Sequence, residues 1–554
     1  MKKIIREKRK LWVVRGLILL LCINLLSGCG RSKSESTAPE TSAGASIAAE
    51  SNLNGLVNTS EDVYFIDDNS LNIRESETEE GNNSVLPDGV SKTEKKYNDT
   101  YFKDYGINPF KDTKNQPMST FSLDVDTASY TIARKYINSG SLPPKDSIRV
   151  EEFINYFKRD YPVPAGDTFS IYTEIAPSAF NRGYHVLEVG IQGKNVEASN
   201  IRRTALTFVI DVSGSMDMDN RLTLVKKSLK LLVDQMSETD KIGIVVYGTN
   251  GRKLLAPTSG ENKERILKAI DKLEPEGSTN AAEGLMLGYD MAYNAFINDG
   301  NNRIILCTDG VANQGITKAE DILKKVEDYK SKGITLTTLG FGMDNFNDIF
   351  LETLANKGDG NYAYIDSLDE AKKIFIDQLA GTLEVIAKDA KVQIEFDRNS
   401  VESYRLIGYE NRLLKDKDFR NNGVDAGEIG AGHAVTALYE VKLKNSIAEY
   451  LGKVSLRYKN PETNKVTEMN KNIKSSLTRD SFYNATPRFR FITMVAQAAE
   501  ILKGSPWVNN TSLEDVYEIL ESDINDLRLS KEDSEFIDLI KSAINLKTDN
   551  IKNR

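Results

Sequence analysis

The sequence predicts an α/β protein whose central part, residues 201–384, forms a doubly wound, mostly parallel sheet. In this part, short apolar runs alternate regularly with segments whose apolar residues recur at helical spacing. Such alternation is typical of parallel strands joined by helices that cover both faces of the sheet. The pattern changes on either side, at residues 97–200 and 385–554. There we expect a strand-rich N-terminal region and an α+β C-terminal domain.

The elements of the central part follow in a fixed order. The first strand, 205–210, precedes a helix over 222–236, and the sequence then predicts strands at 242–247, 303–307, 335–339 and 362–365 and helices at 263–273, 281–296, 319–331, 348–355 and 368–383. Outside this part we expect strands at 169–172, 185–191, 392–396, 434–443 and 454–458, then helices at 489–502, 513–521 and 534–544. Ligand sites in parallel sheets lie at the carboxyl ends of the strands. Asp211 and Asp309 each lie just past such an end.

Residues 1–28 have the composition of a targeting segment. Basic residues between Lys2 and Lys10 precede an apolar run from Leu17 to Leu26, which is short for a membrane span. The run ends in Leu26-Ser27-Gly28-Cys29, which resembles a bacterial lipobox. This resemblance implies cleavage before Cys29 and acylation of its thiol, as by palmitate. The protein is then expected on the extracytoplasmic face of the cell membrane, held by lipid and not by a span. The alternative is an ordinary signal anchor with an incidental cysteine.

Composition limits the remaining classes of function. Residues 29–96 are rich in Ser, Thr, Asn and Glu and poor in aromatic residues, which predicts a disordered linker or stalk. The formal net charge of -9 argues against a nucleic-acid-binding surface. Of the 3 cysteines, Cys22 leaves with the targeting segment and Cys29 is lipidated. Cys307 is left single, and we expect it to be a buried thiol that packs as a small hydrophobic residue.

The segment Asp211-Val212-Ser213-Gly214-Ser215 directly follows the first strand and precedes a helix. That position brings one carboxylate and two hydroxyls into a loop, beside the positive end of a helix dipole. Oxygen ligands of this kind suit Mg²⁺ or Mn²⁺ better than metals that prefer thiolate or imidazole. The sequence therefore predicts a site for one divalent ion.

The same D-x-S-x-S pattern resembles the metal-ion-dependent adhesion site of von Willebrand factor type A (vWA) domains, which are Rossmann-like. The resemblance implies two further ligands from separate loops, Thr279 in the segment 277–280 and Asp309 in the segment 308–310. Five residues would then hold the ion, directly or through water: Asp211, Ser213, Ser215, Thr279 and Asp309. It also implies an open coordination position that accepts a carboxylate from a protein partner.

The flanking regions resemble a bacterial family of vWA lipoproteins. Residues 120–130 and 149–157 match segments that precede the vWA domain in that family, whose C-terminal domain has no known role. Asp124 and Asp126 in the first segment suggest a second metal site, but we favour a helix cap at Asp126 or Thr127. In the C-terminal domain, the Gly-rich segment 427–433 predicts a turn that contains His433, without an accompanying nucleophile motif.

These features lead to a membrane-tethered binding protein that engages a protein ligand through the metal ion. The alternative is an envelope assembly or chaperone scaffold whose metal site is structural or vestigial. We do not expect an enzyme, because the sequence contains no G-x-x-x-x-G-K-[ST], H-E-x-x-H or G-x-S-x-G motif.

Overall fold

The centre of the chain is a six-stranded sheet with strand order β10-β9-β8-β5-β6-β7. The first five of these strands are parallel to one another, and β7 pairs with β6 antiparallel at the edge. The strands are β5 (Thr204–Asp211), β6 (Lys241–Tyr247), β7 (Gly251–Ser259), β8 (Asn301–Thr308), β9 (Ile334–Gly340) and β10 (Tyr362–Tyr364). The doubly wound, mostly parallel sheet expected from the sequence is confirmed, and β7 is an addition that the sequence did not predict.

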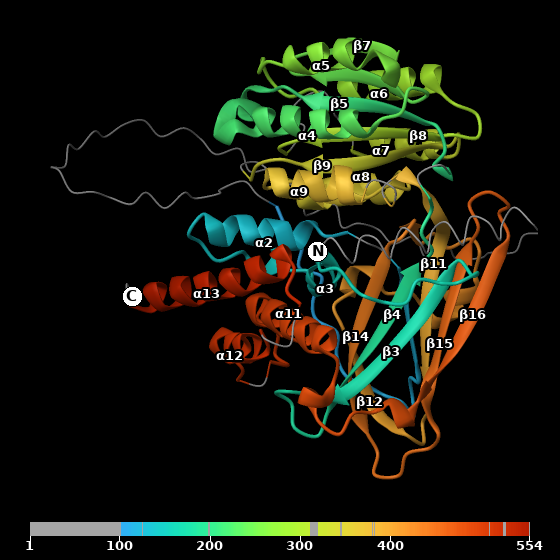
Figure 1. Cartoon of the computed structure of the whole chain (residues 1–554), viewed down its shortest axis with the longest axis vertical. Coiled ribbons are helices and arrows are strands. Elements are labelled where there is room, and N and C mark those ends of the chain that lie inside the picture. The colour runs from blue at the N-terminus through green and yellow to red at the C-terminus, as the bar shows by residue number, and fades with distance from the viewer. Residues whose placement is uncertain are drawn as a thin grey trace, which may run out of the picture. The chain divides into compact units, whose positions relative to one another are not determined.

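Helices cover both faces of this sheet (Figure 1). They are α4 (Arg221–Gln235), α5 (Lys263–Asp271), α6 (Ala281–Ala295), α7 (Ala319–Lys330), α8 (Asp348–Lys357) and α9 (Leu368–Lys372). Alternate residues of β6 enter different cores: Ile244 packs with α4 and α5, whereas Val245 packs with α6 and α8. This alternation explains why β5 and β8, at the centre of the sheet, are buried along their whole length.

The computed structural model describes residues 101–123, 126–197, 200–310, 319–343, 346–378, 381, 383–508, 510–524 and 528–552. The residues from Lys92 to Arg554 form one compact unit. The targeting segment 1–28, the lipidation site Cys29, the linker 29–96 and Asp124 lie outside the described residues. Within the described part of the chain, no helix combines the length and apolar character that a membrane crossing requires.

Two antiparallel sheets pack face to face beside the central sheet. One has the order β1-β12-β14-β4-β3, and the other has the order β13-β11-β15-β16 with β2 also paired to β11. Their strands are β1 (Lys111–Asp112), β2 (Met118–Ser122), β3 (Phe169–Pro177), β4 (His185–Gly193), β11 (Val385–Phe396), β12 (Val401–Ile407), β13 (Gly427–Gly430), β14 (Ala434–Leu443), β15 (Tyr450–Lys459) and β16 (Val466–Lys474). One hydrophobic core joins the two sheets, as in the edge-on contact of Phe169 with Tyr458.

Strands from before and after the central sheet share these two layers. Strand β4 pairs with β14, and β2 pairs with β11, although each pair is more than two hundred residues apart in the sequence. The central sheet, β5 to β10, is therefore inserted in sequence between the strands that form this pair of sheets.

A group of five helices packs against these layers (Figure 1). They are α2 (Ala128–Asn138), α3 (Val150–Tyr156), α11 (Pro487–Lys503), α12 (Leu513–Asp523) and α13 (Lys531–Lys552). Helix α2 is buried on two sides: Ile132 enters a core of the central sheet, and Tyr130 packs on Phe153 and Tyr156 in the helical core. Short helical turns occur at η2 (Lys145–Ser147), η4 (Gly214–Asn220), η5 (Gly260–Asn262), η6 (Lys373–Asp377), η7 (Glu410–Arg412), η8 (Asp416–Arg420), η9 (Ser475–Leu477) and η10 (Phe482–Asn484).

Three local expectations need correction. Thr127 occupies the N-cap position of α2 but makes no side-chain capping bond, and the carboxylate of Asp126 accepts hydrogen bonds from the Tyr362 N–H at 2.9 Å and from Arg412 at 2.9 Å. Both groups are distant in sequence, so tertiary contacts took the place of a cap. The first residues of the Gly-rich segment, 427–430, form strand β13 instead of a turn. The helix expected over 368–383 is α9 followed by a wider π turn, η6.

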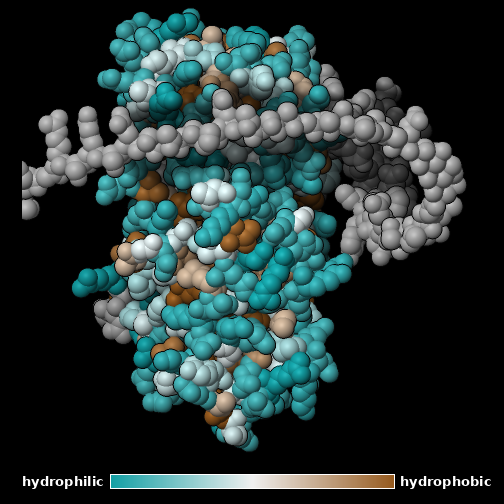
Figure 2. All heavy atoms as spheres, turned by 90° about the vertical axis from the view of Figure 1, so that its right-hand side faces the viewer, coloured by the Kyte–Doolittle hydropathy of each residue, from teal (hydrophilic) through white to brown (hydrophobic). Residues whose placement is uncertain are grey.

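The surface of the protein is mostly hydrophilic on the face that Figure 2 shows. On this face, hydrophobic residues lie in small separate groups. Scattered exposed apolar residues are ordinary on a folded protein and do not by themselves mark an interface.

Candidate metal centre

The two predicted aspartates meet at the carboxyl edge of the central sheet. Asp211 is the last residue of β5, and Asp309 directly follows β8. Since β5 and β8 are parallel neighbours with Ile210 opposite Cys307, both carboxylates emerge at the same edge. Both are buried, with 0% and 4% of their surface exposed. Cys307 is a free, buried thiol, as the sequence predicts.

Hydrogen bonds fix the loop that follows Asp211. One carboxylate oxygen of Asp211 accepts from the Ser213 N–H at 2.8 Å, and the other accepts from the Thr308 hydroxyl at 2.8 Å. The hydroxyls of Ser213 and Ser215 lie 3.0 Å apart. One carboxylate and two hydroxyls of the D-x-S-x-S segment are therefore held by the loop itself and by the neighbouring strand.

The loop that carries Thr279 lies against this segment. The Gly214 N–H donates to the Gly277 carbonyl at 3.0 Å, and the Glu276 N–H donates to the Val212 carbonyl at 2.5 Å. Gly277 has φ +65°, and a Cβ there would fall 2.0 Å from the hydroxyl of Thr249 in the turn between β6 and β7, so both the backbone and this neighbouring turn favour glycine. Thr279 itself is 9% exposed. The backbone thus brings all three predicted loops to one edge of the sheet.

The sequence did not anticipate a cation at this edge. Arg221, the first residue of α4, donates from Nη1 to Oδ2 of Asp309 at 2.6 Å and to the Ser215 carbonyl at 3.3 Å. Only 3% of Arg221 is exposed. The available signal in the sequence was a basic residue at the start of the helix after the motif, where the helix dipole disfavours a cation. Asp217 and Asp219 on the same loop are exposed, as expected for solvated loop residues.

The electrostatics of the site favour a bound cation. Burial and the nearby charge of Asp309 raise the pKa of Asp211 to about 6. Burial also raises the pKa of Asp309, and its hydrogen bonds from Arg221 and Ser215 oppose that rise. Two buried carboxylates that repel each other are costly, and a dication would relieve that cost. The donor set of carboxylates and hydroxyls is the kind that Mg²⁺ and Mn²⁺ accept.

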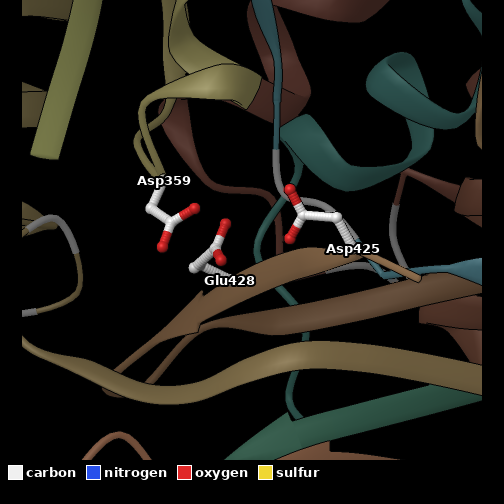
Figure 3. A group of neighbouring side chains, drawn as sticks. All are labelled: Asp359, Asp425 and Glu428. Carbon is white, nitrogen blue, oxygen red and sulfur yellow. The ribbon is translucent and has the colours of Figure 1, made fainter. Parts of the chain in front are cut away.

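A second group of carboxylates lies elsewhere, at Asp359, Asp425 and Glu428 (Figure 3). Their oxygens approach within 4.8 Å of one another, and burial with the charges of its two neighbours raises the pKa of Glu428 well above its ordinary value. Lys330 pairs with Asp359 and also with Asp425 at 3.0 Å, and Lys388 pairs with Asp359 at 3.2 Å. These lysines already supply counter-charge, so the group is an ion-pair network that joins α7 and the end of α8 to β11 and β13.

Comparisons with known proteins agree with this architecture. The model of the von Willebrand factor type A domain matches residues 205–377, that of von Willebrand factor matches residues 96–188, and that of uncharacterized protein YfbK, C-terminal, matches residues 381–546. Among solved structures, von Willebrand factor type A from Catenulispora acidiphila matches with a TM-score of 0.39 and 14% identity, over 66% of this chain and 88% of that one.

Curated relatives cover different shares of the chain. Inter-alpha-trypsin inhibitor heavy chain H3 of Homo sapiens is 28% identical over 284 residues, which are 47% of this chain and 30% of the human protein. Uncharacterized protein sll0103 of Synechocystis is 28% identical over 265 residues, which are 46% of this chain and 61% of the relative. Uncharacterized protein YfbK of Escherichia coli (strain K12) is 38% identical over 442 residues, which are 75% of this chain and 76% of the relative. Since that identity extends from the strand-rich region through the vWA domain into the C-terminal part, the chain belongs to the family of vWA-domain proteins that includes YfbK.

Proposed function

We propose that this protein binds a protein ligand through one Mg²⁺ or Mn²⁺ ion held by Asp211, Ser213, Ser215, Thr279 and Asp309. Domains of the vWA type often mediate binding between proteins through a metal site. The observation that carries the proposal is the joint burial of Asp211 and Asp309 at one sheet edge, with the hydroxyls of Ser213 and Ser215 on the adjoining loop. Arg221 offsets one of the two negative charges, and a bound cation would offset the other.

Each ligand has a distinct task in this proposal. Asp211 and Asp309 supply the negative charge, directly or through water. The hydroxyls of Ser213, Ser215 and Thr279 complete the oxygen shell without adding charge. The ion then keeps an open position and enough positive charge to accept a carboxylate of the partner. No base or nucleophile enters this scheme, and we accordingly propose a binding protein and not an enzyme.

The proposal also includes a location. A lipid on Cys29 would hold the protein at the extracytoplasmic face of the cell membrane, and residues 29–96 would act as the stalk. The variant Cys29→Ser should move the protein from the membrane fraction to the soluble fraction of cells. Unchanged fractionation would contradict lipid attachment at this residue and leave the metal site untouched.

The test of the metal site is calorimetric titration of Mg²⁺ and Mn²⁺ into the full-length protein in detergent. The wild type should bind about one ion, and Asp211→Ala should bind none while its far-UV circular dichroism stays unchanged. Asp217→Ala is the matched control, because Asp217 is an exposed aspartate of the same loop outside the ligand set. Equal binding by Asp211→Ala and the wild type would refute the assignment.

The second candidate, an envelope scaffold with a structural or vestigial metal site, is favoured by one observation. The Arg221 guanidinium already occupies one oxygen of Asp309. A wild type that binds neither ion, even with a carboxylate compound present, would support this candidate.

A further inference from the structure

The guanidinium of Arg221 is built into the candidate metal centre. It donates from Nη1 to Asp309 at 2.6 Å and to the Ser215 carbonyl at 3.3 Å, and it is 3% exposed. A buried charge is tolerated only when it is paired and hydrogen-bonded. Both of these contacts are to residues of the ligand set, so the pairing of Arg221 and the state of the metal site are linked.

The surrounding chain makes room for this side chain. Gly342, in the loop after β9, has φ +90°, and a Cβ on it would lie 2.2 Å from Nε of Arg221. A second carboxylate is also within reach, because Oδ2 of Asp219 lies 4.0 Å from Nη2 and its side chain is 49% exposed. Arg221 therefore has a buried partner in Asp309 and an exposed one in Asp219.

We propose that Arg221 is the internal counter-ion of the metal site: it neutralises Asp309 while no ion is bound, and it makes firm ion binding depend on the carboxylate of the partner. This inference rests on the proposed function, since it concerns the same site. It assigns to Arg221 a positioning and affinity-setting role that none of the predicted ligands has.

The charge balance explains the dependence. Asp211 and Asp309 together carry two negative charges, and Arg221 offsets one of them. A bound dication then leaves the site with one excess positive charge, which a single carboxylate from the partner cancels. Without Arg221 the two aspartates would balance the ion alone, and the ion would attract the partner less strongly.

The test is calorimetric titration of Mn²⁺ into the full-length protein, first in chloride and then in acetate at the same ionic strength. Acetate is the carboxylate probe. Four proteins are compared: wild type, Arg221→Gln, Arg221→Lys and the control Arg420→Gln. Arg420 is an exposed arginine at the end of the helical turn η8 that pairs with Glu468 on β16, so its variant has the same chemistry and charge change at a distance from the site.

In chloride, Arg221→Gln should bind Mn²⁺ about tenfold or more tightly than the wild type, because a charged hydrogen bond to Asp309 no longer competes with the ion. Arg221→Lys keeps the charge and should stay near the wild type, as should Arg420→Gln. Acetate should tighten Mn²⁺ binding by the wild type and have little effect on Arg221→Gln.

Equal or weaker Mn²⁺ binding by folded Arg221→Gln, compared with the wild type, would overturn the counter-ion role and leave the metal site intact. If Arg221→Gln does not fold, the titration of the wild type tests the inference. An affinity of the wild type for Mn²⁺ that is the same in acetate and in chloride would contradict it. Absence of binding by every protein in both salts would overturn the metal site, and the inference with it.

Discussion

The buried ion pairs of Arg149 give the sharpest prediction about stability. Arg149 precedes helix α3 and is 3% exposed. Its guanidinium donates to Asp348, the first residue of α8, at 2.5 Å and 3.1 Å, and it also pairs with Glu152. One cation thereby ties the helical group to the central vWA domain. The proposed change is Arg149→Met, which keeps an unbranched side chain, shorter than that of arginine, and removes its charge.

The expected cost follows from the two carboxylates that lose their partner. Glu152 and Asp348 are 3% and 1% exposed, so water cannot replace the guanidinium. Removal of one partner from a buried ion pair typically costs about 3–5 kcal/mol of unfolding free energy. We expect a loss in this range or above it, because a single substitution leaves two acids without their cation.

The loss should also depend on pH. Burial raises the pKa of Glu152 to about 7 even with Arg149 present to oppose the rise. Without Arg149 that pKa rises further. A carboxyl whose pKa is higher in the folded state binds more protons when folded, so stability falls as pH increases. The difference between wild type and Arg149→Met should therefore be larger at pH 8 than at pH 6.

Urea unfolding followed by far-UV circular dichroism at both pH values measures this difference. The matched control is Lys268→Met, which removes an exposed cation paired with Glu264 at the surface of α5. Such a pair contributes less than about 1 kcal/mol. A loss below about 1 kcal/mol for Arg149→Met, or a loss that shrinks from pH 6 to pH 8, would refute the reasoning.

Three further predictions use the same unfolding assay. Burial lowers the pKa of His433 from 6.5 to about 4, and neither ring nitrogen has a hydrogen-bond partner among the described residues. Between these values the unfolded state binds more protons than the folded state, so the free energy of unfolding should fall from pH 6.5 toward pH 4, by at most about 3 kcal/mol. The variant His433→Gln should depend less on pH over this range, and an equal pH dependence of variant and wild type would contradict the prediction. Burial among carboxylates raises the pKa of Glu428, so Glu428→Gln should be more stable than the wild type at pH 8, and this difference in stability should be smaller at pH 5. A difference that grows toward pH 5 would contradict the prediction. Gly342→Ala should lower the free energy of unfolding more than Gly106→Ala. Both glycines have positive φ, which costs alanine about 1–2 kcal/mol, but only a Cβ at Gly342 meets a neighbour, Arg221, at 2.2 Å. Equal losses would show that the guanidinium moves aside at no cost.

Much of the vWA domain could be predicted because its signals are local. The apolar strand that ends at Asp211 and the amphipathic helix that follows were both expected within one residue of their observed starts, since a short apolar run and a period of about 3.6 residues both appear directly in the sequence. Strand β7 escaped prediction because it lies at the sheet edge and is largely exposed. Its residues therefore lack the apolar pattern that marks a buried strand.

Part of the candidate site could also be predicted from the sequence, and part could not. Asp211, Ser213 and Ser215 are close in sequence, and Thr279 and Asp309 were supplied by a family motif. Their approach in space follows from parallel strand ends. The pairing of Arg221 with Asp309 joins residues 88 positions apart, and no local pattern reports such a contact. The same holds for Asp126, whose predicted capping role gave way to contacts with Tyr362 and Arg412.

The sequence by itself determined the central α/β sheet, the edge at which polar residues gather and the oxygen chemistry of those residues. These properties depend on hydrophobic periodicity and residue type, which neighbouring positions encode. Only the tertiary structure decided that β4 pairs with β14 and β2 with β11 across the whole vWA domain, and that a buried arginine balances Asp309. Both depend on contacts between distant segments, and the free energy of those contacts arises from packing and burial that exist only once the chain has folded.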